Sequence, residues 1–129
     1  MTAAAAGPRK RSRASARKAG PDFERKTADY WQDSLDQPFI DRRVKTGAKD
    51  KGDIANVRLA GHRIVVECKE ERAIDLAGWI TEAQKEAEND GALCGIVVAK
   101  RVKKGRPEDQ YAIMTQGDLM KILSLIPRS

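Results

Sequence analysis

Asp53, Glu67 and Lys69 are the residues of this chain whose types and spacing could do chemistry together. Glu67 and Lys69 stand at the end of the apolar run Ile64–Val66, and Asp53 precedes that run. Two carboxylates held close together repel each other unless a cation lies between them, and a hard divalent ion such as Mg²⁺ prefers oxygen ligands. With Lys69 beside the ion to stabilise developing negative charge, the set could support metal-assisted hydrolysis of a phosphodiester bond.

The pattern of an acid, any residue and a lysine is weak by itself, and it occurs twice here. The copy at 24–26 falls on a predicted helix, where its acid and its lysine lie on different faces. The copy at 67–69 falls on a predicted strand, where period two sends Glu67 and Lys69 to one face and Cys68 to the other. Only the second copy can build a site, with the carbonyl of Cys68 as a further candidate metal ligand.

Whether Asp53 reaches the face of Glu67 depends on the register of the hairpin that joins their strands, because a slip of one residue reverses every side chain. A two-residue turn at Ala60-Gly61 would place Asp53 opposite Cys68, on the wrong face. A three-residue turn that also includes Leu59 would pair Asp53 with Glu67, and Gly61 suits the positive φ of its bulge position.

The chain reads as a single α/β domain with a mixed, mostly antiparallel sheet flanked by helices, in the order αβββαββα. Apolar periodicity, caps and turn residues define the elements. The expected helices cover residues 22–35, 75–88 and the segment that starts at Thr115, and the expected strands cover 38–44, 53–59, 62–69, 93–100 and 111–115. The last helix is expected to turn Leu119, Ile122, Leu123 and Ile126 inward.

The net charge of +6 comes from the N-terminal segment. Residues 1–20 carry basic residues and no acid, whereas residues 21–129 carry nineteen of each sign. Without large apolar side chains after Met1, this segment is expected to be a disordered basic arm that follows phosphates. A solvated tail without a role and a targeting peptide are the alternatives.

Membrane and zinc functions are not expected. No apolar run approaches the roughly 20 residues that span a bilayer, and no secretory signal is apparent, so a cytoplasmic protein is expected. Cys68 and Cys94 each lie in an apolar run, as small buried thiols do. With one histidine and no paired cysteine spacing, the sequence does not predict a zinc site.

Gly52-Asp53 followed by Glu67-Cys68-Lys69 at the end of an apolar strand, then a helix and another apolar strand, resembles the PD-(D/E)XK nuclease superfamily. Within it, the chain is most similar to the archaeal-type Holliday junction resolvases and their phage and bacterial relatives, over roughly residues 20–126. The resemblance implies a restriction-endonuclease-like domain over residues 21–129. It also implies a Mg²⁺-dependent DNA endonuclease, with Mn²⁺ as a substitute, in which Asp53 and Glu67 bind the metal and Lys69 assists.

Two further site residues follow from the resemblance. The family has an acid on its first helix, which matches Glu24, and often a polar residue on the helix after the lysine strand, which matches Gln84. A snorkelled or capping acid and an ordinary flanking residue are the respective alternatives. Gly52 stands where the family usually has proline, and Asp41 and Thr46 are the only candidates for the further polar residue of some resolvases.

Basic residues outside the acidic site are the candidate DNA contacts. A solvated hairpin tip is the alternative for the run after residue 99, but phosphate contacts are favoured if the chain is a nuclease. The expected DNA-binding residues are Arg9, Lys10, Arg11, Arg13, Lys100, Arg101, Lys103, Lys104 and Arg106. Rival functions are another DNA repair nuclease on the same fold, a non-catalytic nucleic-acid-binding module with Glu67 and Lys69 as a surface ion pair, and a small interaction protein.

A resolvase makes two symmetric nicks, whereas this chain has residues for one such centre. A homodimer with a twofold axis would supply both. The candidate surfaces are the Trp79 side of the second helix and the last helix, with Leu125 beyond its inward line.

Overall fold

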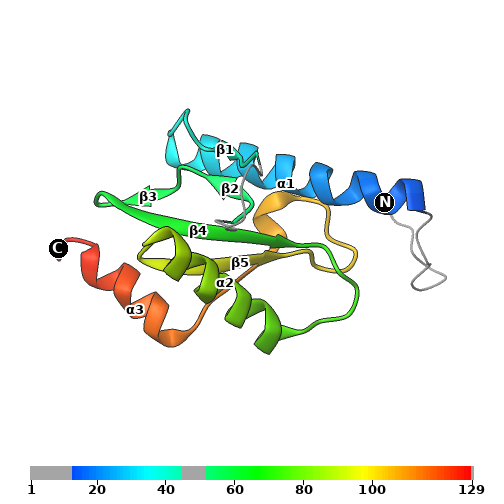
Figure 1. Cartoon of the computed structure of the whole chain (residues 1–129). Coiled ribbons are helices and arrows are strands. Elements are labelled where there is room, and N and C mark those ends of the chain that lie inside the picture. The colour runs from blue at the N-terminus through cyan, green and yellow to red at the C-terminus, as the bar shows by residue number, and fades with distance from the viewer. Residues whose placement is uncertain (1–12, 45–51, 129) are drawn as a thin grey trace.

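The computed structural model describes residues 13–44 and 52–128, with side chains from Pro21 onward. They form an α/β domain with a mixed sheet (Figure 1). The helices are α1 (Arg13–Leu35), α2 (Leu76–Asp90), α3 (Gln116–Leu125) and the short 3₁₀ helix η1 (Pro107–Asp109). The strands are β1 (Asp41–Arg42), β2 (Ile54–Ala55), β3 (Arg58–Leu59), β4 (His62–Lys69), β5 (Cys94–Ala99) and β6 (Tyr111–Ile113). The expected α/β class is therefore confirmed, but the single strand expected at residues 53–59 is divided into β2 and β3.

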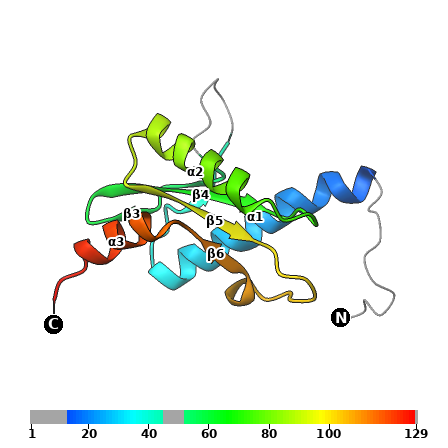
Figure 2. The same ribbon diagram turned by 90° about the horizontal axis from the view of Figure 1, so that it is seen from below.

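The sheet has the order β1-β2-β4-β5-β6, and β3 pairs with β4. Only β4 and β5 run parallel, because helix α2 carries the chain back between them. Figure 2 shows α2 on one face of the sheet, and α1 with α3 on the other. The central strands are therefore covered on both sides, which explains why all six residues of β5 are buried.

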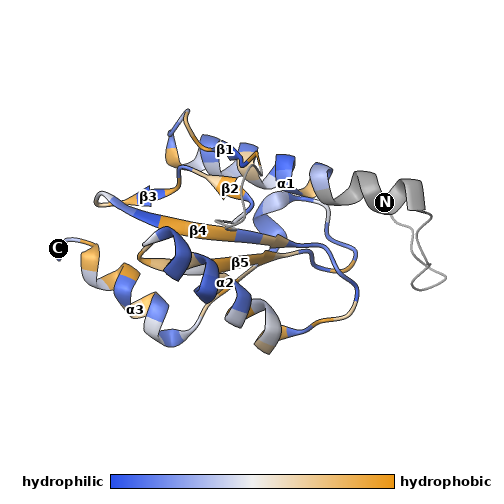
Figure 3. Cartoon of the chain, in the orientation of Figure 1, coloured by the Kyte–Doolittle hydropathy of each residue, from blue (hydrophilic) through white to orange (hydrophobic). Residues whose placement is uncertain are grey.

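The core is divided by the sheet into two unequal parts. The larger part lies on the side of α1, where Phe23 and Ala28 pack on Ile54, Val66 and other strand residues. The smaller part lies on the side of α2, where Trp79 and Ala83 pack on Val97 and Ala99. Figure 3 shows β4 as hydrophobic in its middle and hydrophilic at its end, so the candidate residues emerge where the core stops.

The hairpin register differs from both expected alternatives. The turn is the two-residue Ala60-Gly61, with φ of +50° and +81°, because Leu59 pairs with His62. Yet Ile54 pairs with Val66, so the first strand has one extra residue between the two pairings. Asn56 lies in this bulge with φ of +70°, a conformation that asparagine tolerates better than most residues. The bulge shifts the register by one residue, which places Asp53 opposite Glu67 despite the shorter turn.

Two helices differ from their expected form. Helix α1 begins at Arg13, so residues 13–20 of the expected arm are helical, as the propensities of alanine, arginine and lysine favour. Residues 1–12 lie outside the described part of the chain.

No helix within residues 13–44 or 52–128 is long and apolar enough to cross a bilayer.

Helix α3 is rotated from the expected orientation. Its N-cap Thr115 accepts a hydrogen bond from the backbone N–H of Asp118, as predicted. However, Asp118 is buried and accepts from the Gly95 N–H, with Ile122 packed below it. Leu119, Leu123 and Ile126 are exposed instead of buried, so the expected inward line was wrong. The reason is that the helix turns its acid, not its leucines, toward the backbone of β5.

Gly52 has a backbone that a proline could not adopt. Its φ is +93°, whereas proline fixes φ near −65°. A Cβ at Gly52 would lie 2.9 Å from Val65 Cγ1 and 3.0 Å from the Val66 carbonyl oxygen. Glycine is therefore required both for the positive φ and for the close approach to β4.

We predict that Gly52→Ala lowers the free energy of unfolding by about 2 kcal/mol or more, because it combines a strained φ with a steric clash. Gly61→Ala is the matched control, since Gly61 also has a positive φ but nothing lies within 4 Å of an added Cβ. It should cost about 1 kcal/mol. Urea denaturation measures the free energy of unfolding of both variants. Equal losses would show that the close approach of Gly52 to β4 adds no cost beyond the positive φ.

Candidate active site at the end of strand β4

Glu67 and Lys69 point to the same face at the end of β4, the face covered by α2. Glu67 is 5% exposed, and the Lys69 side chain is 15% exposed. The Lys69 ammonium lies 2.6 Å from a carboxylate oxygen of Glu82, 3.8 Å from one of Glu71 and 4.0 Å from one of Glu67. The two residues are thus joined by an ionic network and are not a solvated strand tip.

Two acids of α2 extend this network, and the sequence reasoning missed both. Carboxylate oxygens of Glu67, Glu82 and Glu86 all lie within 4.8 Å of one another, which makes them the one three-carboxylate group within the described residues that could hold a metal ion. Glu86 is 3% exposed and lies beside Ala83 and Ala87 on the buried face of α2. Glu82 lies one turn after Trp79, and Glu86 lies one turn after Glu82. This i, i+4 spacing is the feature of the sequence that could have identified the pair.

The protonation of Lys69 is set by two opposing effects. Burial lowers the pKa of its ammonium, but the hydrogen bond to Glu82 and the charges of Glu82, Glu67 and Glu71 raise it by more. The pKa of Lys69 is therefore above its ordinary value, and the residue is a cation at neutral pH. In this state it can stabilise negative charge but cannot act as a base.

Asp53 lies where β2 meets β4 and is 2% exposed. Its backbone N–H donates to the Val66 carbonyl at 2.8 Å, and its carboxylate accepts the Cys68 N–H at 2.8 Å. The carboxylate is therefore held against the backbone of β4, one residue beyond Glu67. Asp53 is not a member of the group formed by Glu67 with the two acids of α2.

Cys68 points to the opposite face, toward α1, where it packs on the larger core. Burial, and then the charge of Asp53, raise the pKa of the Cys68 thiol far above its ordinary value. The thiol is therefore protonated at neutral pH, and a protonated thiol is a poor nucleophile.

Glu24 lies on the α1 side of the sheet. Its carboxylate pairs with the Arg42 guanidinium at 3.3 Å, and its charge contributes to the raised pKa of Cys68. It is thus close to Cys68 and not part of the three-carboxylate group around Glu67. Of the expected acids, the structure brings Asp53 to β4 and leaves Glu24 and Glu67 on opposite sides of the sheet.

Two of the remaining candidates lie at exposed positions, and the others lie outside the described side chains. Gln84 is exposed on α2, between Glu82 and Glu86 in the sequence. Asp41 accepts a hydrogen bond from Arg25 at 2.6 Å on the edge strand β1, and Thr46 lies outside the described residues. Arg9, Lys10 and Arg11 also lie outside them, and the side chain of Arg13 is not among those described.

The basic segment Lys100–Arg106 is a structured loop between β5 and η1. Gln110 holds it: its side-chain amide donates to the carbonyls of Lys104 and Arg106, and its carbonyl oxygen accepts the Arg101 N–H. Lys103, Lys104 and Arg106 are exposed. The loop therefore presents cations from a fixed position.

Comparison with protein-family models, with curated proteins and with solved structures gave no significant match. The site must consequently be interpreted from its own chemistry. Clustered carboxylate oxygens are the donors that Mg²⁺ and Mn²⁺ prefer, so the residues present fit a divalent ion at Glu67, Glu82 and Glu86.

We predict that Lys69→Met lowers stability at neutral pH, because it leaves the carboxylates near Glu67 without their ammonium. A raised folded-state pKa stabilises the protein fully below the unfolded-state value of about 10.5, and this contribution is lost as the pH rises through the folded-state pKa. The stability difference between wild type and variant should therefore shrink above about pH 10.5. Urea denaturation from pH 7 to 11 measures it.

Lys85→Met is the control, because Lys85 is exposed on helix α2, the helix that carries Glu82 and Glu86. It should change stability little at any pH. A difference for Lys69→Met that stays constant through pH 11 would contradict an electrostatic role for the ammonium.

Proposed function

We propose that this chain is a metal-dependent DNA endonuclease, and within that class a resolvase of four-way junctions. The observation that carries the proposal is the arrangement at the end of β4. There Glu67 and the Lys69 cation share one face, 4.0 Å apart, and the Asp53 carboxylate is hydrogen-bonded to the next backbone N–H. An acid, a second acid and a protonated lysine at one sheet end are the groups that metal-assisted phosphodiester hydrolysis requires.

The metal would be held by Glu67 together with Asp53, with Glu82 and Glu86, or with all three. Asp53 is the partner that the resemblance implies, and Glu82 and Glu86 are the partners whose oxygens lie within reach. When bound, a divalent ion neutralises charge on the phosphate and lowers the pKa of a water molecule so that hydroxide can form near pH 7.

Lys69 would act on the phosphate as a fixed positive charge. Its raised pKa keeps it protonated over the whole physiological range. In a half-buried position this charge interacts more strongly with a phosphoryl oxygen than it would in water. The carboxylates that hold it also orient it, so it is directed before the substrate arrives.

A non-catalytic nucleic-acid-binding module is the second candidate. It is favoured by the anchored loop Lys100–Arg106, which could contact phosphates without any metal. In that case the network around Lys69 would only stabilise the packing of α2 on β4. The two functions differ in whether substitutions in the network affect cleavage or only stability.

We predict that Asp53→Asn, Glu67→Gln and Lys69→Ala each reduce cleavage of a labelled four-way junction in Mg²⁺ by roughly 10²-fold or more, because each removes charge at the reacting centre. DNA binding in a chelator should change little, since Lys69 contacts the basic loop through its backbone carbonyl, which accepts the Lys100 N–H at 2.9 Å and is retained in the variant. Gel-based cleavage and binding assays measure both properties.

Glu88→Gln is the matched control, because it makes the same chemical change at an exposed position of α2. It should cleave at the wild-type rate. If Glu67→Gln also cleaves at the wild-type rate while remaining folded, the assignment of the site is wrong.

The proposed resolvase would be a homodimer, and α3 offers the surface for it. Trp79 is buried in the core and Leu125 is half-buried, so neither is the exposed apolar residue that an interface needs. Instead, an apolar stripe runs along the outer side of α3. It consists of Leu119, Met120, Leu123 and Ile126, which are 37%, 52%, 49% and 51% exposed. Contiguous apolar surface of this kind is typical of interaction sites.

We predict that the wild-type protein is a dimer of twice 14.3 kDa in solution and that Leu123→Glu makes it a monomer, because the variant buries a charge in an apolar interface. Thr81→Glu adds the same charge at an exposed position of α2, outside the stripe, and should leave the dimer intact. Light scattering measures the mass. A wild-type monomer, both free and on DNA, would contradict the resolvase proposal but not the nuclease proposal.

A further inference from the structure

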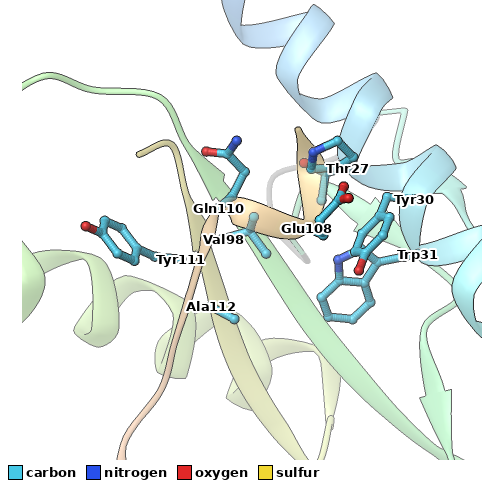
Figure 4. A pocket seen from close by; sticks show the side chains of 9 residues that line it. Thr27, Tyr30, Trp31, Val98, Glu108, Gln110, Tyr111 and Ala112 are labelled. Carbon is cyan, nitrogen blue, oxygen red and sulfur yellow. The ribbon is translucent and has the colours of Figure 1, made fainter. Parts of the chain in front are cut away.

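A pocket of about 200 Å³ lies on the α1 face of the sheet, between α1 and η1. It is separate from the network around Glu67, which faces α2. Thr27, Tyr30 and Trp31 line it from α1, and Glu108 lines it from η1. Figure 4 shows the rings of Tyr30 and Trp31 close together on the side of α1. Tyr30 is 38% exposed, so its ring remains accessible from solvent.

The size and the lining select a small planar ligand. Pockets for drug-sized molecules begin at roughly 300 Å³, so this pocket suits a single heteroaromatic ring. Aromatic side chains form stacking platforms for nucleobases because every base has a π face. Glu108 adds a carboxylate, which accepts hydrogen bonds from the amino group of a base such as cytosine.

Cations lie at the pocket beside these aromatic residues. The Arg106 guanidinium lies 3.7 Å from a Glu108 carboxylate oxygen and is largely exposed. Gln110, which also lines the pocket, fixes the loop that carries Lys104 and Arg106. A base in the pocket would therefore have its phosphates next to an anchored group of positive charges.

We propose that this pocket binds one unpaired nucleobase of a DNA strand, with preference for a base that has an exocyclic amino group. The proposal rests on the proposed function for the choice of DNA as the ligand, and it adds a contact with an unstacked base beside a branch or an end. Tyr30 and Trp31 stack on the base, Glu108 accepts from its amino group, and the loop Lys100–Arg106 contacts the flanking phosphates.

The test uses single-stranded probes of ~10 nucleotides in the presence of a chelator: oligo(dC), oligo(dT) and an abasic sugar-phosphate strand of equal charge. The chain has two tryptophans, and Trp79 is buried on the other face. A Trp79→Phe background therefore reports on Trp31 alone. Oligo(dC) should quench its fluorescence and bind roughly 5- to 100-fold more tightly than the abasic strand, as stacking of a base predicts. Oligo(dT) should bind between the two.

Tyr30→Ala should remove most of the difference between oligo(dC) and the abasic strand, and Glu108→Ala should remove the preference of dC over dT. Phe39→Ala is the matched control, because Phe39 is an aromatic residue that is 79% exposed and does not line this pocket. It should leave the base dependence unchanged.

Equal affinity for oligo(dC) and the abasic strand, or equal losses in Tyr30→Ala and Phe39→Ala, would overturn the proposal. The two proposals fail separately. If the protein cleaves junctions but does not distinguish bases from abasic sites, the nuclease proposal stands and the pocket proposal fails. If it shows base-dependent quenching without cleavage, the pocket proposal stands and the nuclease proposal fails.

Discussion

The contact of Lys69 with the carboxylates around it joins helix α2 to the end of strand β4. Glu67 and Glu86 are almost fully buried, and a buried carboxylate is costly unless a cation or hydrogen bonds compensate for its lost hydration. Lys69 joins the strand to the helix through Glu82 at 2.6 Å and remains near Glu67. The raised pKa of Lys69 is the electrostatic consequence of this arrangement.

The position of Asp53 depends on a second constraint, the bulge in the hairpin. Sequence alone predicted the dependence of Asp53 on register, but it left a two-residue turn and a three-residue turn open. It did not predict the bulge at Asn56, because a two-residue turn and a single asparagine in a polar strand do not show how many residues separate two pairings. That information lies in tertiary contacts, such as the hydrogen bond from the Asn56 amide to the Phe39 carbonyl at 2.8 Å.

The helices were harder to predict than the strands in one respect, their rotation. On β4, period two was enough to place Glu67 and Lys69 on one face and Cys68 on the other. On α2, Trp79, Ala83 and Ala87 are buried, whereas Leu76 at the start of the helix is 50% exposed, and Glu86 of the carboxylate cluster is buried beside Ala83 and Ala87. On α3, the contact of Asp118 with the backbone of β5 outweighed the leucines. On α3 a buried acid lies where apolar periodicity predicted leucines, and apolar periodicity carries no information about buried acids.

Metal binding and the position of Lys69 are thermodynamically linked if the acidic cluster takes a divalent ion. The ion and the ammonium would both interact with Glu67, so an ion that binds the three carboxylates competes with Lys69 for Glu82. If Lys69 loses interaction free energy in this exchange, metal binding is weakened by the same amount. A loss of about 1.4 kcal/mol corresponds to a tenfold lower affinity for the metal. A phosphate near the displaced ammonium would restore that energy. Metal and substrate should then bind more tightly together than separately, which is the coupling expected of two ligands that share one set of charges.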